Sequence, residues 1–148
     1  VGPAARASKI DMDARRDFPH AAYPHLRFEV PVLEDGDVLA RFVVRALEAR
    51  QSADMIRQIA ANLPGGKIRV PVGELPAYRY HLGITESARG ENVHFVMTGP
   101  GNTIYRYRVR SASYANWPVL PYCVPGNIVP DFPLINKSFE LCYSCCDR

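Results

Sequence analysis

Residues 37–63 read DVLARFVVRALEARQSADMIRQIAANL and carry the longest helical pattern in the chain. Asp35 or Asp37 is placed to cap the start of a helix, and Pro64-Gly65-Gly66 is placed to end it. Apolar residues recur every three or four positions, which is the spacing of one helical face: Leu39, Phe42, Val43, Ala46, Leu47, Ala53, Ile56, Ile59, Ala60 and Leu63. The pattern predicts one long amphipathic helix, with the other face formed by Arg41, Arg45, Glu48, Arg50 and Arg57.

After this helix the pattern changes to that of strands. Three apolar or aromatic residues, at positions 105, 107 and 109, alternate with three arginines, at 106, 108 and 110. This period of two is typical of a half-buried strand. Because Gly99-Pro100-Gly101-Asn102 separates this run from the β-prone residues 93–98, we expect a hairpin near 93–110. Shorter β-prone runs lie at 67–72 and 78–81.

Prolines dominate both ends of the chain. Residues 1–32 contain four prolines and predict extended chain over the core, with at most a short strand at 26–30. Their dense mixed-charge patch at 11–17 indicates either a solvated loop or a salt-bridge network. Residues 112–120 fit a short helix, and the prolines between 121 and 135 predict a long irregular C-terminal tail. The fold class expected is α+β, with the long helix packed on a small antiparallel sheet.

Length and composition exclude several classes of protein. The 148 residues are 47% hydrophobic and 22% charged, which fits one domain over 1–148. The net charge of +3 is too small to indicate nucleic-acid binding. No apolar run reaches the roughly 18 residues of a membrane helix, and no signal peptide is visible. The first residue is Val1 rather than methionine, so we expect part of a longer protein.

Three of the four cysteines lie within the last seven residues, as Cys142, Cys145 and Cys146, with Cys123 upstream. Such clustering indicates metal ligation or redox chemistry in a reducing compartment, because a disulfide framework would spread its cysteines along the chain. The C-x-x-C at 142–145 lets two thiolates face one soft metal, such as zinc, nickel, copper(I) or iron. A closed zinc site needs four ligands, which counts against such a site here. A thioredoxin-like redox pair normally opens a helix, which counts against a redox pair at the end of the chain.

A second candidate is the segment 86–91, ESARGE. Gly90 after Arg89 allows close backbone approach and an outward guanidinium. The alternative is a surface turn in which Arg89 pairs with Glu86 or Glu91. The four histidines lack the spacing of metal ligands on a helix.

Several motifs together resemble the C-terminal end of a [NiFe]-hydrogenase large subunit. The chain is most similar to the formate hydrogenlyase and hydrogenase-4 type of energy-converting hydrogenase, through the segments 114–118 (YANWP), 126–127, 133–135 and 142–148. Other segments resemble both this type and its relative, the 49 kDa protein of respiratory complex I: 15–19, 36–52 and the Glu-x-x-Arg-Gly-Glu-x-x-His pattern at 86–94.

The resemblance implies a nickel–iron centre with CO and cyanide ligands and assigns roles at it. Cys142 would be a terminal nickel ligand and first proton acceptor, and Cys145 would bridge nickel and iron. Arg89 would lie over the open coordination position. The family's Asp-Pro-Cys is here Glu140-Leu141-Cys142. Two further cysteines must come from an upstream C-x-x-C, which Cys123 alone does not supply, so the chain holds at most half of the ligands.

The resemblance also implies partners and a location. These are an iron–sulfur small subunit, membrane subunits, and a maturation protease that cleaves after the residue matched by Arg148. We expect a peripheral position on the cytoplasmic face of the inner membrane, reversible H2 oxidation by the intact complex, and an inactive isolated domain. One alternative is a complex I-like quinone oxidoreductase domain that lines a quinone pocket without a NiFe site. Another is a small zinc-binding interaction module.

Overall fold

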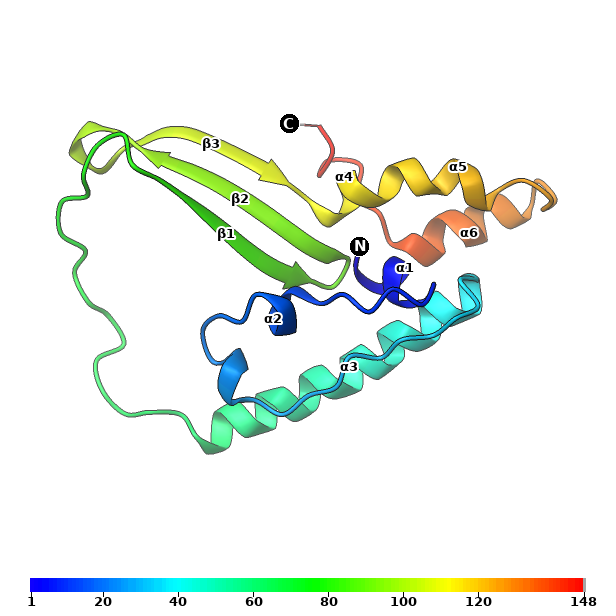
Figure 1. The fold of residues 1–148 in the computed structure, drawn as a ribbon, viewed down its shortest axis with the longest axis horizontal. Coiled ribbons are helices and arrows are strands. Elements are labelled where there is room, and N and C mark those ends of the chain that lie inside the picture. Colours follow the sequence, from blue (N-terminus) through cyan, green and yellow to red (C-terminus); the bar gives the residue numbers. More distant parts are fainter. Residues whose placement is uncertain (148) are drawn as a thin grey trace.

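The computed structural model describes residues 1–147, so Arg148, matched above to the maturation cleavage site, lies outside the described residues. It confirms the α+β class. The elements follow the order α1 (Gly2–Arg6), α2 (Ala14–Asp17), η1 (Tyr23–His25), α3 (Val38–Ala61), β1 (Tyr80–Ser87), β2 (Gly90–Thr98), η2 (Pro100–Asn102), β3 (Ile104–Arg110), α4 (Ala112–Asn116), η3 (Trp117–Val119), α5 (Leu120–Cys123) and α6 (Asp131–Phe139) (Figure 1).

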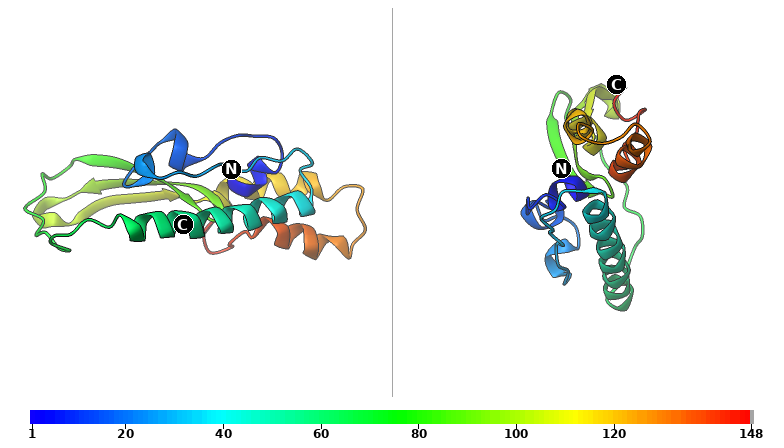
Figure 2. Two further views of the ribbon diagram at one scale, coloured as in Figure 1. Left: turned by 90° about the horizontal axis from the view of Figure 1, so that it is seen from below. Right: turned by 90° about the vertical axis from the view of Figure 1, so that its right-hand side faces the viewer.

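The molecule is elongated. The sheet and α3 run along its length, and the short N-terminal helices α1 and α2 lie between them (Figures 1 and 2). Helices α4, α5 and α6 gather at one end, where α6 packs against α3. Two small apolar clusters form the described core, one of Ala7, Ala40 and Val44, the other of Leu120, Ile135 and Phe139.

The long helix α3 confirms the strongest prediction from the sequence. Asp37 is the N-cap, and its side chain accepts a hydrogen bond from the backbone N–H of Ala40 at 2.7 Å. The helix ends at Ala61, with Asn62 as its C-cap, two residues short of the predicted stop at Pro64.

The expectation about the faces of α3 was wrong. Arg41, expected on the solvent side, is 3% exposed, while Phe42 of the predicted apolar face is 66% exposed. Arg41 is held inside by polar acceptors from other segments, because it donates to Ser138 Oγ at 2.9 Å and to the Gly36 carbonyl at 2.6 Å. Its guanidinium also lies over the Phe139 ring, 4.2 Å from the centroid.

The hairpin expected near 93–110 is confirmed as β2 and β3, which pair antiparallel with His94 opposite Val109. Of the run at 78–81, only Tyr80 and His81 are in a strand, the start of the longer β1, so the sheet is three-stranded in the order β1-β2-β3. Residues 26–30 and 67–72 are not strands. The first of these segments runs beside α3 instead, where Gln58 bonds the backbone N–H and carbonyl of Arg27 at 2.8 and 2.7 Å.

The tail expected to be irregular contains the helices α5 and α6, so that prediction was wrong. Its prolines are tolerated because Pro121 and Pro133 occupy the first turns of these helices, where backbone N–H groups have no intrahelical acceptor. The side chains of Leu120, Ile135 and Phe139 then bury one face of the pair. Apolar packing therefore orders this region despite its prolines.

Candidate metal centre

The C-x-x-C motif lies in a turn that the start of α4 holds in place. The chain leaves α6 through Glu140, whose φ of 55° is left-handed, and reaches Cys142 two residues later. Two buried serines then anchor the turn. Ser113 Oγ accepts from the Cys142 N–H at 3.0 Å, and Ser111 Oγ donates to the Cys145 carbonyl at 2.9 Å.

The thiol of Cys142 is acidic for a cysteine. Ser144 Oγ lies 3.1 Å from Cys142 Sγ. Hydrogen bonds from Ser144, and then from the side chain and backbone of Cys145, lower the pKa of Cys142 from 9.0 to about 7. Because the thiolate is the form that binds soft metals, Cys142 is suited to be a ligand near neutral pH.

The structure brings together only part of a metal site. None of the four cysteines forms a disulfide within residues 1–147, and Cys123 on α5 packs against the Leu120 cluster. Within residues 1–147, no group of three or more cysteine, histidine, aspartate or glutamate side chains is arranged to hold a metal ion. Cys142 and Cys145, the pair that the C-x-x-C motif singles out, lie in this one turn, and their role as metal ligands stays a prediction.

Arg89 occupies the tip of the β1–β2 hairpin, where Ser87 pairs with Gly90 across a tight turn. Its Nε donates to the carbonyl of Glu140, two residues before Cys142. The alternative of a surface ion pair within the hairpin was wrong, because Glu86 pairs with Arg6 and Glu91 pairs with Arg110. The structure thus joins two segments that are 51 residues apart and that the sequence singled out separately.

Asn116 is a site residue that the sequence alone did not identify. It is 2% exposed, and its Nδ2 donates to the carbonyls of Val1 at 3.1 Å and Arg89 at 3.4 Å. Its Oδ1 accepts from the Val1 amino group at 2.7 Å. The only sequence signal was its place inside the YANWP motif, which by itself gives the asparagine no role.

Two glycines let the hairpin tip approach the start of the chain. Gly2 and Gly90 have φ of +64° and +125°, and their backbones touch. A Cβ on Gly2 would lie 2.4 Å from the Arg89 carbonyl oxygen, and a Cβ on Gly90 would lie 2.7 Å from the Gly2 nitrogen. Both positions therefore require glycine, and this contact fixes the turn that carries Arg89.

A buried ion network anchors the base of the same hairpin. Arg6 has no exposed surface, and it pairs with Asp13 at 3.3 Å, Glu48 of α3 at 2.6 Å and Glu86 of β1 at 3.0 Å. Burial raises the pKa of Glu48 and of Glu86, although Arg6 partly opposes this. Burial would also raise the pKa of Asp13, but its hydrogen bonds and ion pair with Arg15 outweigh burial and lower it. The mixed-charge patch is therefore a buried salt-bridge network at Asp13.

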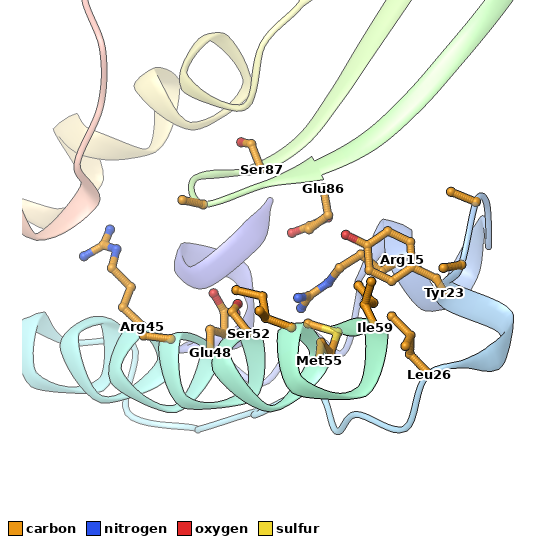
Figure 3. A pocket seen from close by; sticks show the side chains of 15 residues that line it. Arg15, Tyr23, Leu26, Arg45, Glu48, Ser52, Met55, Ile59, Glu86 and Ser87 are labelled. Atoms are coloured by element: carbon orange, nitrogen blue, oxygen red, sulfur yellow. The ribbon is translucent and has the colours of Figure 1, made fainter. Parts of the chain in front are cut away.

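A cavity of about 570 Å³ lies between α3, the N-terminal segment and the hairpin (Figure 3). Tyr23, Met55 and Ile59 form its apolar side, and charged residues, among them Glu86, form the other. Arg45 also lines the cavity, and its buried Nε has no hydrogen-bond partner among the described atoms.

Known proteins match the chain over its whole length. The family described as "Respiratory-chain NADH dehydrogenase, 49 Kd subunit" matches residues 1–77 and 69–148. Formate hydrogenlyase subunit 5 of Escherichia coli (strain K12) is 43% identical over 100% of this chain and 26% of its own length. Hydrogenase-4 component G of the same strain is 39% identical over 95% of this chain and 25% of its own length. An NADH-quinone oxidoreductase subunit of Anaeromyxobacter dehalogenans (strain 2CP-C) is 36% identical over 100% of this chain and 41% of its own length.

A solved structure shares the fold. A chain of the membrane-bound sulfane sulfur reductase, an archaeal respiratory membrane complex, has a TM-score of 0.90 and 31% identity. The match covers 100% of this chain and 42% of that one, so the chain spans less than half of each relative. Within residues 1–147, no helix is long and apolar enough to cross a membrane. The matches confirm the resemblance carried by the motifs, since its relatives include a formate hydrogenlyase subunit and a hydrogenase-4 component, and the chain belongs to the oxidoreductase family of the 49 kDa subunit of respiratory-chain NADH dehydrogenase.

Proposed function

We propose that the chain is part of the catalytic large subunit of an energy-converting [NiFe]-hydrogenase of the formate hydrogenlyase type. Cys142 and Cys145 are two of its cysteine ligands, and the other two come from outside these 148 residues. The observation that carries the proposal is the anchored turn with an acidic Cys142 thiol beside Arg89. The similarity to two proteins named as formate hydrogenlyase and hydrogenase components supports it.

The residues of the turn fit this role by their chemistry. When bound, a nickel–iron centre with CO and cyanide ligands supplies the Lewis acid and electron acceptor for reversible H2 oxidation and proton reduction. Without metal, Cys142 Sγ has a pKa of about 7, so a large fraction is thiolate at neutral pH and available to bind the metal; once bound, this thiolate would be the base placed to accept a proton. The positive charge of Arg89 favours the thiolate of Cys142, and the hydrogen bond to Glu140 orients the guanidinium.

The proposal includes an assembly. The intact subunit works with an iron–sulfur small subunit and with membrane subunits, peripheral on the cytoplasmic face of the inner membrane. A maturation protease processes its C-terminus. The chain alone lacks two ligands and the electron acceptor, and it is inactive by itself.

A second candidate is a complex I-like domain that lines a quinone pocket and holds no nickel or iron. It is favoured by the family match and by the 36% identity to a subunit of an NADH-quinone oxidoreductase. Under this alternative, the acidic thiol of Cys142 has no metal to bind.

Metal analysis of the natively matured full-length subunit distinguishes the two. We expect nickel and iron in equal amounts by mass spectrometry, with infrared bands of bound CO and cyanide. Cys142→Ser and Cys145→Ser should lose the nickel, while Cys123→Ser, a matched change on α5, should retain it. Competently matured wild-type protein without either metal would move the assignment to the quinone-pocket domain.

A further inference from the structure

The outward face of α3 carries a continuous apolar stripe, which we call the α3 seam. Its members are spaced alternately by three and four residues, the heptad spacing of a helix that packs against another helix. All of them are exposed, and Ala49 and Ile56 also line the cavity, so the stripe borders it there: Leu39, Phe42, Ala46, Ala49, Ala53, Ile56 and Ala60. Leu39, Phe42 and Ile56 are each 66% exposed. At 1.5 Å per residue, the stripe is about 30 Å long.

The opposite face of the helix makes this stripe unusual. A surface helix normally turns its apolar stripe toward the core and its charges toward water. Here Arg41 and Glu48 face inward, where Ser138 and Arg6 bind them, and the α3 seam faces outward. The helix forms one edge of the molecule in Figure 1 and projects from it in the right-hand view of Figure 2. Such a long apolar stripe on a protein surface marks an interaction site.

We infer that the α3 seam is the docking surface for an amphipathic helix contributed by the part of the large subunit outside these 148 residues. The relatives make room for such a helix, because the matched region is only 26% of formate hydrogenlyase subunit 5 and 42% of the structural neighbour. More than half of each relative is therefore further chain, available to cover this face.

The shape of the α3 seam specifies its partner. Alanines occupy its centre at 46, 49 and 53, and larger side chains stand toward its ends at Phe42 and Ile56. Small central residues allow helix axes to approach to about 8 Å. The docking helix is therefore expected to place its large apolar side chains opposite the alanines, and small ones opposite Phe42 and Ile56.

Charge disfavours a second copy of this chain as the occupant. In the heptad pattern, Arg50 and Arg57 flank the α3 seam on one side, and Arg45, which also lines the cavity, flanks it on the other. Parallel pairing of two copies would set Arg45 near Arg50 of the other copy, and antiparallel pairing would set arginines at 50 and 57 side by side. Like charges at these positions oppose association, so the docking helix should carry acidic residues along its apolar stripe.

This inference goes beyond the proposed function and does not depend on nickel binding. The test places the photoreactive residue p-benzoylphenylalanine at Phe42 in the full-length gene product, in the cells that make it. After irradiation, we expect a monomer-sized product in which position 42 is joined to a peptide of the same polypeptide from outside residues 1–148. A product of twice the mass, a link to a different polypeptide, or no crosslink would each overturn the inference.

A charge substitution gives an independent measurement. Ala53→Glu places a carboxylate at the centre of the α3 seam, and Ala61→Glu places one at an exposed position of the same helix outside it. In the full-length subunit, we expect Ala53→Glu to reduce the soluble, protease-resistant yield several-fold and Ala61→Glu to leave it near wild type. Equal yields from the two variants would contradict a docked helix.

Discussion

The buried ion network gives the sharpest test of what fixes the hairpin, and Arg6→Met is the substitution that removes it. Methionine fills much of the same volume but has no charge. The change leaves Glu48 and Glu86 without their shared cation, and the Met12 carbonyl without the donor that now lies 2.8 Å away. Asp13 keeps its bonds to Arg15. The variant therefore isolates two buried carboxylates from their counterion.

The expected loss follows from this geometry. Removing one partner of a buried ion pair costs about 3–5 kcal/mol, because the remaining charge stays desolvated. We expect the free energy of unfolding of Arg6→Met to fall by about that amount at neutral pH. The matched control is Arg16→Met, since Arg16 pairs with Asp11 and Asp17 but its side chain is 42% exposed. Exposed pairs contribute about 0–1 kcal/mol, so the control should be close to wild type.

The pH dependence gives a second, independent signature. Glu48 and Glu86 have folded-state pKa values raised above 4.5, so their contribution to stability is fully present below that pH and is lost as pH rises through the folded pKa. Without Arg6 these pKa values rise further. The loss in free energy of unfolding that Arg6→Met causes, relative to wild type, should therefore shrink in mildly acidic solution and grow toward alkaline pH.

Urea unfolding of the chain, followed by circular dichroism and by the fluorescence of Trp117, measures both effects. Trp117 is the single tryptophan and contacts the Tyr143 ring, with 4.9 Å between centroids. Two results would contradict an electrostatic role of the network. One is a free energy of unfolding that falls no more in Arg6→Met than in Arg16→Met at neutral pH. The other is a loss in Arg6→Met that does not change with pH.

Three further predictions concern the residues around Arg89 and Cys142. Asn116→Ala should lower the free energy of unfolding by about 1–3 kcal/mol and increase hydrogen exchange at the hairpin tip, while Asn127→Ala, at an exposed asparagine whose hydrogen bonds stay at the end of α5, should leave exchange at the hairpin tip unchanged. Gly90→Ala should be strongly destabilising in thermal unfolding because its Cβ meets the Gly2 backbone at φ +125°, whereas Gly65→Ala, with open space around it, should be tolerated. In the metal-free chain, alkylation of Cys142 should show a midpoint at a pH of about 7, and Ser144→Ala should move that midpoint upward; an unmoved midpoint would contradict the role of the Ser144 hydroxyl.

The sequence correctly predicted those elements that are determined by residues close to them in the chain. The Asp37 cap, the stop after α3 and the β2–β3 hairpin depend on neighbouring residues, and the structure confirms them. The helix α6 was not predicted, because prolines usually break helices. Here their place in the first helical turn, and the packing of Phe139 against distant Leu120, make the helix stable. The contact of Arg89 with Glu140 spans 51 residues, and no local pattern predicts it.

The orientation of α3 shows why hydrophobic periodicity alone does not predict which face of the helix contacts the site. Periodicity identified a helix with two unlike faces, and burial of apolar surface favoured the wrong one as the inner face. The inner face carries the buried apolar residues Ala40, Val44 and Met55 together with charged side chains, and these charged side chains connect the parts of the site. Glu48 binds Arg6, which also binds Glu86 at the base of the hairpin that carries Arg89, and Arg41 binds Ser138 on the helix that leads to Cys142. One helix therefore connects to both the segment of the arginine and the segment of the thiol through its charged side chains, and its exposed apolar side is where we infer that the rest of the subunit docks.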